Sequence, residues 1–339
     1  MRLRRLLVAA VGTGLVLSVA PASAAVDRGR TDHDAAAEEA VALLDRAAVA
    51  ARRLSYSGTQ YVASWRGGVA DSSLVELAHD PAGGSVVSGA AGEHPEAAGA
   101  TAHLDLRMLD RLAAAYDLSV SGPGRCTGRE ASVVEARRDD GGVAGRFWVD
   151  EDSGMLLRRE VFDEQGRRVR SAAFVDLVVQ DATAARPAGV PSRLSGRERP
   201  AGALLERLRE EGWHVPEELP DGFALFEARQ DDEVLHLAYT DGLSVLSLFA
   251  QDGGLGDSEV DGFDRESVDG APVWVRRTAP ERVVWQGGGQ VWTLVSDGAE
   301  SSALAAVTAL PHDAPPEDGL RARLSRGASR LAGMLNPFD

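Results

Sequence analysis

Turn-forming residues recur at short intervals through the middle of this 339-residue chain and leave room only for strands between them. Asp152-Ser153-Gly154 and Asp163-Glu164-Gln165-Gly166 are two such turns. Turns at this spacing indicate an antiparallel meander, because each strand must return beside the one before it. The predicted strands occupy residues 118–120, 127–137, 145–150, 156–163 and 168–179.

The residues before this meander change from a helical to a strand period. Val41, Leu44, Ala48 and Ala51 recur at helical spacing, whereas alternation with a period of two begins at Ser55. We therefore expect an antiparallel sheet with two helices in a first domain over residues 25–182. Its opening elements are predicted as a helix over 34–53, strands over 55–64 and 72–78, a loop over 79–101 and a helix over 104–116.

A Pro-rich segment separates this domain from a second one. Residues 183–203 contain Pro187, Pro191 and Pro200 among small and polar residues, which is typical of an interdomain linker. Residues 204–312 then predict a smaller α+β domain, so the fold class is α+β. Its strands are expected at 223–229, 233–240, 243–250, 271–277, 283–286 and 290–296, with a helix at 299–310.

Charge and cysteine content exclude several functions. Acidic residues number 52 against 36 basic ones, a formal charge of −16. General nucleic-acid binding needs a basic face that displaces counterions from phosphates, so we do not expect a nucleic-acid partner. The single cysteine, Cys126, excludes an intramolecular disulfide framework and a cysteine-based zinc site.

The N-terminus predicts export. A basic start is followed by an apolar run over residues 6–20 and by the small triplet Ala22-Ser23-Ala24, the order found in a secretory signal peptide. We expect residues 1–24 to be removed and the mature protein to lie in the periplasm or cell-wall space, outside the cytoplasmic membrane. An uncleaved anchor is the alternative, although the run is shorter than the roughly 20 residues that a span needs.

Motifs for catalysis or metal binding are absent from the sequence. The seven histidines never reach the spacing of a metal pair on a helix. No nucleophile elbow, phosphate-binding loop or dinucleotide fingerprint occurs, and Gly287-Gly288-Gly289 is interpreted as a hairpin turn. We therefore predict no catalytic residues, no cofactor and no metal. A hydrolase whose catalytic set is dispersed along the sequence stays an alternative.

Aromatic residues suggest either a core or an apolar cavity. Four of the six tryptophans fall inside predicted strands, where their large side chains pack in a core or line a cavity for a hydrophobic ligand. The candidate cavity residues are Trp65, Phe147, Trp148 and Leu156.

The last residues, 313–339, predict a basic amphipathic tail. Such a helix lies on an anionic membrane, on an acidic partner, or on the acidic body of its own chain. The candidate contact residues are Leu320, Arg323, Leu324, Arg330 and Leu331.

Taken in order, several segments resemble the MucB/RseB family of extracytoplasmic sigma-factor (sigma-E) regulators. The Lys-free, Ala- and Arg-rich composition suggests an actinobacterial-type member. The matching segments are Leu54-Ser55-Tyr56-Ser57-Gly58-Thr59, Cys126-Thr127-Gly128-Arg129, Phe147-Trp148-Val149-Asp150, residues 154–160, Asp163-Glu164-Gln165-Gly166, Pro220-Asp221-Gly222-Phe223, residues 236–249 and Val291-Trp292-Thr293-Leu294-Val295.

The resemblance implies a fold and a partner. The fold is an N-terminal antiparallel half-barrel wrapped on helices, similar to the lipoprotein carrier LolA, joined to a smaller α+β domain. The partner is the extracytoplasmic region of an anti-sigma factor, which such regulators shield from proteolysis and release when a lipid-like ligand binds. Carriage of a lipid or other apolar envelope molecule in the LolA-like cavity is the rival function.

The expected partner contact is the second domain and the interdomain groove, with one hairpin at its centre. A tight turn near residue 241 joins two apolar strands, so an edge strand there is predicted to pair with an extended peptide by β-augmentation. The alternative is that this hairpin is the core of its domain. The candidate contact residues are Tyr239, Asp241, Gly242, Leu243, Ser247 and Phe249.

Overall fold

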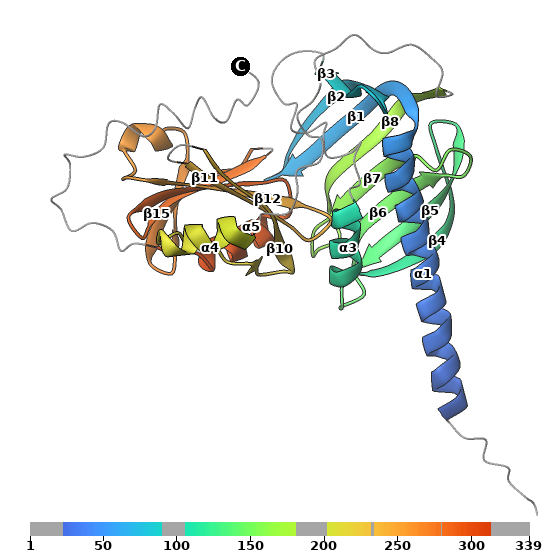
Figure 1. Ribbon diagram of the computed structural model, residues 1–339, viewed down its shortest axis with the longest axis horizontal. Helices are drawn as coiled ribbons and strands as arrows, with labels where there is room; N and C mark the ends of the chain where they lie inside the picture. The colour runs from blue at the N-terminus through green and yellow to red at the C-terminus, as the bar shows by residue number, and fades with distance from the viewer. Residues whose placement is uncertain (1–22, 90–105, 181–201, 232–233, 279, 313–339) are drawn as a thin grey trace, which may run out of the picture.

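The computed structural model describes residues 23–89, 106–180, 202–231, 234–278 and 280–312, which form two antiparallel sheets of eight strands each (Figure 1). The predicted tail, most of the predicted linker and all but the last two residues of the predicted signal peptide lie outside the described residues. None of the described helices is both long enough and apolar enough to cross a membrane.

The first sheet has the strand order β3-β2-β1-β8-β7-β6-β5-β4. It consists of two meanders, β1 to β3 and β4 to β8, which are joined where β1 pairs with β8. The strands are β1 (Ser55–Arg66), β2 (Val69–Asp80), β3 (Gly84–Gly89), β4 (Asp117–Cys126), β5 (Arg129–Arg137), β6 (Val143–Asp150), β7 (Leu156–Phe162) and β8 (Arg168–Gln180).

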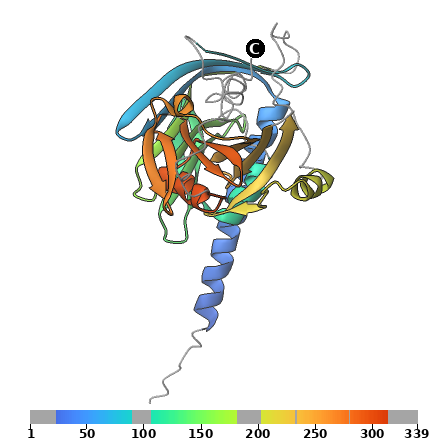
Figure 2. The same cartoon turned by 90° about the vertical axis from the view of Figure 1, so that its left-hand side faces the viewer.

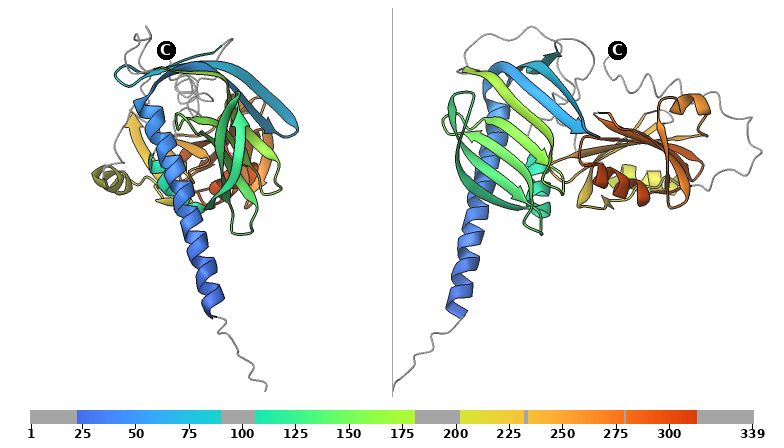
Figure 3. Two further views of the ribbon diagram at one scale, coloured as in Figure 1. Left: turned by 90° about the vertical axis from the view of Figure 1, so that its right-hand side faces the viewer. Right: turned by 180° about the vertical axis from the view of Figure 1, so that it is seen from behind.

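Helices α1 (Ser23–Arg53) and α3 (Leu106–Ala115) pack on the inner face of this curved sheet, as the two views of Figure 3 show. Leu44 of α1 and Leu112 of α3 are fully buried in one apolar cluster with Phe147 of β6. Small residues of α1 such as Ala47 join this cluster. Small side chains let the helix axis approach the sheet closely, so α1 and the curl of the sheet stabilise each other.

A tight turn between β4 and β5 closes the curl at one end. Thr127 and Gly128 have φ of 56° and 75°, a pair of left-handed residues typical of a type I′ hairpin. Threonine rarely adopts this left-handed conformation. At Thr127 the hydroxyl donates a hydrogen bond of 2.5 Å to the carbonyl of Phe174 in β8. The turn thereby contacts a strand that lies four places away in the sheet.

The second sheet has the strand order β13-β14-β15-β16-β12-β11-β10-β9. Its strands are β9 (Glu218–Leu219), β10 (Phe223–Asp231), β11 (Val234–Thr240), β12 (Val245–Asp252), β13 (Asp264–Val268), β14 (Ala271–Arg276), β15 (Glu281–Gly287) and β16 (Gln290–Ser296). Helices α4 (Gly202–Glu210) and α5 (Glu300–Thr308) cover one face, and the short helix η1 (Asp257–Val260) precedes β13.

Two tryptophans form the centre of this second core. Trp285 and Trp292 are fully buried and stack with their ring centroids 6.1 Å apart. Each indole N–H donates to a carbonyl, Trp285 to Pro311 and Trp292 to Gly287, both at 2.9 Å. Large apolar area is thus buried without leaving a polar atom unpaired, so these two residues belong to the core and not to a cavity.

The predicted α+β architecture, a half-barrel on helices followed by a second α+β unit, is confirmed, with local corrections. The expected loop over 79–101 was wrong at its start, because β2 continues to Asp80 and β3 follows. Strand β4 extends well beyond the predicted 118–120 through Pro123. A proline is tolerated there because β4 is an edge strand, and a bulge beside Gly122 adjusts the register.

Replacing Leu44 by Ala is expected to destabilise the first unit by about 2–5 kcal/mol, because the cavity left under α1 has packed neighbours on every side. The neighbouring exposed residue gives the control, and Asp45→Ala is expected to stay within about 0.5 kcal/mol of the wild type. Urea unfolding measures both differences. Equal effects of the two substitutions would show that α1 does not pack as described.

Candidate functional site

The turn between β11 and β12 lies at the junction of the two sheets. Asp241 holds it, since its Oδ1 accepts hydrogen bonds from the amides of Leu243 at 2.8 Å and Ser244 at 2.7 Å. Thr240 adds a second brace, accepting from the amide of Gly242 and donating to the carbonyl of Ser244. Gly242 has φ of 91°, which other residues rarely adopt, so the turn has one well-defined shape.

This turn inserts into the first unit. Leu243 is 2% exposed and belongs to the apolar cluster beneath α1, and the lack of a side chain at Gly145 makes room for it. A Cβ added to Gly242 would lie 2.5 Å from the backbone nitrogen of Leu112. Tyr116 donates a hydrogen bond of 2.6 Å from its hydroxyl to Asp241 Oδ2. The two units therefore share part of one core.

Buried charge surrounds the turn. Arg159 of β7 is 6% exposed and donates to the carbonyl of Leu243. Burial, and then the nearby Arg170, lower the pKa of Arg159 to about 10, while burial raises the pKa of Asp241 above its ordinary value. Both groups are costly to bury, and the hydrogen bonds of the turn offset that cost. Removing the side chain of Arg159 or of Asp241 would leave polar groups of the turn at the junction without their hydrogen-bond partners.

A second contact links the tip of the β1–β2 hairpin to the second unit, above which this hairpin arches in Figure 2. Arg66 forms an ion pair of 2.9 Å with Glu281 at the start of β15, where their side chains are 9% and 2% exposed. Arg170 pairs with Asp297, whose other carboxylate oxygen accepts from the amide of Val245 at 2.7 Å. Across the junction the cations come from the first unit and the acids from the second.

The residues of the predicted partner hairpin thus lie in different environments, some in the core of the second unit and some against the first unit. Tyr239 is fully buried in the second core and donates to the carbonyl of Pro216 at 2.9 Å. Asp241, Gly242 and Leu243 contact the first unit of the same chain, as described above. The prediction of an edge strand was wrong: β11 pairs with β10 and β12, and β12 pairs with β11 and β16, so both strands have partners on both sides. Their backbone groups are not available for β-augmentation.

Ser247 and Phe249 lie elsewhere, on what we call the open face, the face of the second sheet opposite α4 and α5. Alternation along β12 directs Leu246 and Leu248 into the core and these two residues away from it. Phe249 stacks on His236 of β11, with ring centroids 4.4 Å apart and planes 6° apart. Burial, and then Arg229, lower the pKa of His236 to about 4, so its ring is neutral at pH 7.

The open face continues across the sheet through paired residues. Phe249 is opposite Thr293 of β16, Thr293 is opposite Val284 of β15, and Val284 is opposite Trp274 of β14. Arg282 lies on the same face, two residues from Val284. Sequence reasoning missed His236, Trp274 and Arg282 as neighbours of Ser247, because the register of four strands brings them together and no local signal marks it.

The structure does not bring the four predicted cavity residues together. Phe147 and Leu156 are buried in the core beneath α1. Trp148 follows Phe147 and points to the other side of the strand, where the guanidinium of Arg158 lies 4.6 Å from its ring. Trp65 is covered by another arginine in the same manner. The predicted tail residues, Leu320, Arg323, Leu324, Arg330 and Leu331, lie outside the described residues.

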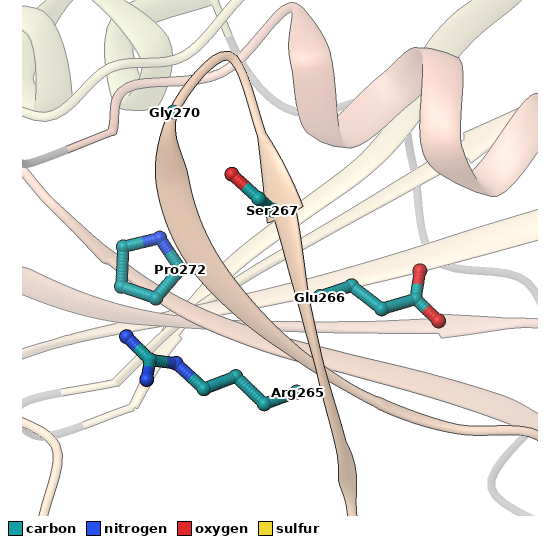
Figure 4. A pocket seen from close by; sticks show the side chains of 5 residues that line it. All are labelled: Arg265, Glu266, Ser267, Gly270 and Pro272. Carbon is teal, nitrogen blue, oxygen red and sulfur yellow. The ribbon is translucent and has the colours of Figure 1, made fainter.

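A shallow depression of about 320 Å³ lies at the edge hairpin of β13 and β14 (Figure 4). It is lined by Arg265, Glu266, Ser267, Gly270 and Pro272. In Figure 4 the side chains of Arg265 and Glu266 lie apart and do not converge on Ser267, so the depression offers no assembled acid–base or nucleophilic set. Across the part of the chain that the structure describes, no cluster of three or more His, Cys, Asp or Glu side chains is placed to hold a metal ion.

Glu281 is expected to make stability depend on pH. Burial raises its pKa to about 7 although Arg66 lowers it. The folded protein thus binds this proton more tightly than the unfolded chain does. The contribution of this proton to the free energy of unfolding is fully present below about pH 4.5 and is lost as the pH rises through about 7. Between about pH 5 and about pH 8 we expect the wild type to lose stability, on the order of 1–3 kcal/mol, relative to Glu281→Gln. Urea unfolding at a series of pH values measures this, and parallel profiles would contradict it.

Comparison with known proteins adds the relatives of this chain. The model of the MucB/RseB N-terminal domain matches residues 89–194. The sigma-E factor regulatory protein RseB of Haemophilus influenzae is 28% identical over 163 residues, which are 44% of this chain and 48% of RseB. The match thus spans about half the length of that curated relative.

Solved structures of MucB are also similar to this chain. A Pseudomonas aeruginosa MucA/MucB complex gives a TM-score of 0.45 at 22% identity, covering 81% of this chain and 100% of that one. A crystal structure of MucB with MucA(peri) gives 0.45 at 21% identity with the same coverage. The domain match and the likeness to RseB show that this chain resembles the MucB/RseB family over residues 89–194 and over the 163 residues aligned with RseB.

Proposed function

We propose that this protein is a non-catalytic regulator of a sigma-E-type envelope-stress response and that it binds the extracytoplasmic region of an anti-sigma factor. Its match to the MucB/RseB N-terminal domain and its likeness to RseB, a sigma-E factor regulatory protein, carry this proposal. The predicted signal peptide supports a location outside the cytoplasmic membrane, where such a region is accessible. A lipid-like ligand regulates the binding.

The open face of the second sheet is the proposed contact surface. It retains Ser247 and Phe249 of the predicted hairpin, whereas Asp241 to Leu243 are occupied by contacts within the chain. Half-buried aromatic and arginine side chains, here Trp274 and Arg282, are enriched in protein interfaces. The Nε atom of Arg282 is buried without a hydrogen-bond partner, which an acidic or carbonyl group of the anti-sigma segment would supply.

The junction supports the proposal in a second way. Because the turn at Asp241 is inserted into the first unit, an event in that unit that moves Leu112 or Tyr116 displaces β11 and β12 as well. The same strands carry Phe249 and His236 on the open face. Ligand binding in the first unit and partner binding in the second are therefore mechanically connected, as a ligand-released regulator requires.

Carriage of a lipid is the second candidate. It is favoured by the curved first sheet, whose inner face beyond α1 is apolar at Val62, Val75 and Ala172. A carrier would copurify with lipid and would have no affinity for an anti-sigma factor. A regulator binds the anti-sigma region when no lipid is bound and releases it when the lipid-like ligand binds.

Replacing Ser247 by Arg is expected to weaken binding of the purified anti-sigma extracytoplasmic region at least about tenfold, because a long charged side chain then stands in the contact surface. The matched control is Ser301→Arg on α5, the opposite side of the second unit, which is expected to bind like the wild type. Titration calorimetry measures both affinities.

A third variant separates binding from folding. Leu248 is fully buried beside Ser247, so Leu248→Asp is expected to unfold the second unit, visible as loss of its cooperative thermal transition. If the Ser247→Arg protein is folded and binds the anti-sigma region with normal affinity, the open face is not the contact surface.

A further inference from the structure

The edge hairpin of β13 and β14 sorts its charges between the two faces of the second sheet. In Figure 4 the side chains of Arg265 and Glu266 lie on opposite sides of β13. Arg265 is opposite Trp274 in the register and therefore shares the open face with it. Glu266 and Glu300 of α5 both pair with Arg277, on the face that the helices cover. The arginine of β13 thus belongs to the open face and the glutamate does not.

Two further arginines lie side by side on the open face. Arg276 of β14 is directly opposite Arg282 of β15 in the antiparallel register. Both are on the open face, because their neighbours Val275 and Val283 are buried in the core. Side chains that are directly opposite have Cβ atoms about 5 Å apart, and like charges in this position destabilise a sheet. The free protein therefore carries a repulsive pair that folding does not require.

The charges of these arginines are not balanced within the described part of the chain. Arg265, Arg276 and Arg282 form no ion pair there. The Nε atom of Arg282 is buried and has no hydrogen-bond partner. Arg276 donates to the carbonyl of Asp261 at 3.0 Å and lies over the ring of Phe263. These contacts fix the position of the Arg276 guanidinium but leave its positive charge uncompensated.

Acidic side chains of the open face lie at the other edge of the sheet. Among the described strand residues they belong to β9 and β10, where Glu227 already pairs with Arg229. Strands β15, β16, β12 and β11 separate β10 from β14. We call Arg265, Arg276 and Arg282 the arginine cluster. It forms a cationic surface around Trp274 on a chain whose formal charge is −16.

We propose that the arginine cluster and Trp274 bind an acidic segment of the partner, in which carboxylates flank an apolar side chain. This inference rests on the proposed function and names the chemistry of the partner at that surface. The carboxylates pair with the guanidinium groups, and the apolar side chain covers the indole ring between them. A carboxylate placed between Arg276 and Arg282 also removes their mutual repulsion, which contributes to the affinity.

The test uses the whole mature chain, residues 25–339, and a labelled heptapeptide as the probe, acetyl-Ser-Glu-Phe-Glu-Phe-Glu-Ser-amide. A second peptide with glutamine in place of every glutamate has nearly the same shape without the charge. Fluorescence anisotropy measures both affinities. We expect saturable binding of the glutamate peptide at about 50 mM salt, at least about tenfold weaker binding at about 500 mM salt, and no binding of the glutamine peptide.

Variants of the cluster locate the binding. Arg265→Gln combined with Arg282→Gln is expected to weaken binding of the glutamate peptide at least about tenfold, while the Tm stays equal or rises because the repulsive pair is gone. The matched control is Arg207→Gln combined with Arg209→Gln, which removes the same charge from α4 on the opposite face and is expected to bind like the wild type.

A single variant keeps the test decisive if the double variant folds poorly. The side chain of Arg265 is exposed, so Arg265→Gln is expected to fold normally and to bind the glutamate peptide at least about threefold more weakly than the wild type.

The outcomes separate this inference from the proposed function. Equal affinity of the wild type and the folded cluster variants, equal binding of the two peptides, or no saturable binding of the glutamate peptide overturns the inference. The anti-sigma extracytoplasmic region is titrated against the same proteins. Its failure to bind the wild type overturns the proposed function and leaves the peptide result intact. Undiminished binding of that region by the double cluster variant overturns the inference and leaves the proposed function standing.

Discussion

Three arginines of the first unit hold the second unit in place, and the remaining features depend on that attachment. Arg66 and Arg170 pair with Glu281 and Asp297, and Arg159 donates to the carbonyl of Leu243. These groups are buried or nearly so, so separating the units would leave charges without partners as well as expose the apolar side chain of Leu243. The junction is therefore specific in register and orientation, because hydrogen-bonded charges tolerate little displacement.

The attachment decides which surfaces stay available to other molecules. The turn at Gly242, which sequence patterns suggest as a peptide contact, is used to bind the two units together. The open face, with Phe249 and Trp274, is not used in this attachment, and the buried Nε atom of Arg282 on it has no hydrogen-bond partner. The inserted turn at Asp241 connects the strands of this face to the first unit. This arrangement fits a protein in which a ligand bound by one unit alters the affinity of the other for a partner.

The sequence predicts what local chemistry determines. The meander from β5 to β8 follows from its turns, and all six strands predicted for the second unit occur. The edge strand β13 and the short strand β9 were not predicted, because they contain too few apolar residues to form a strand pattern. The site depends on long-range pairs instead: Tyr116 and Asp241 are separated by 125 positions, and Arg159 and Leu243 by 84.

The most direct test of the central claim is a pull-down of the mature protein, residues 25–339, from detergent-solubilised membranes of its own source, with protein and lipid both identified by mass spectrometry. The account predicts recovery of a membrane-spanning anti-sigma factor, lost when Ser247→Arg replaces the wild type and kept with Ser301→Arg. Recovery of acylated lipid with no anti-sigma factor would contradict the account and identify the protein as a carrier.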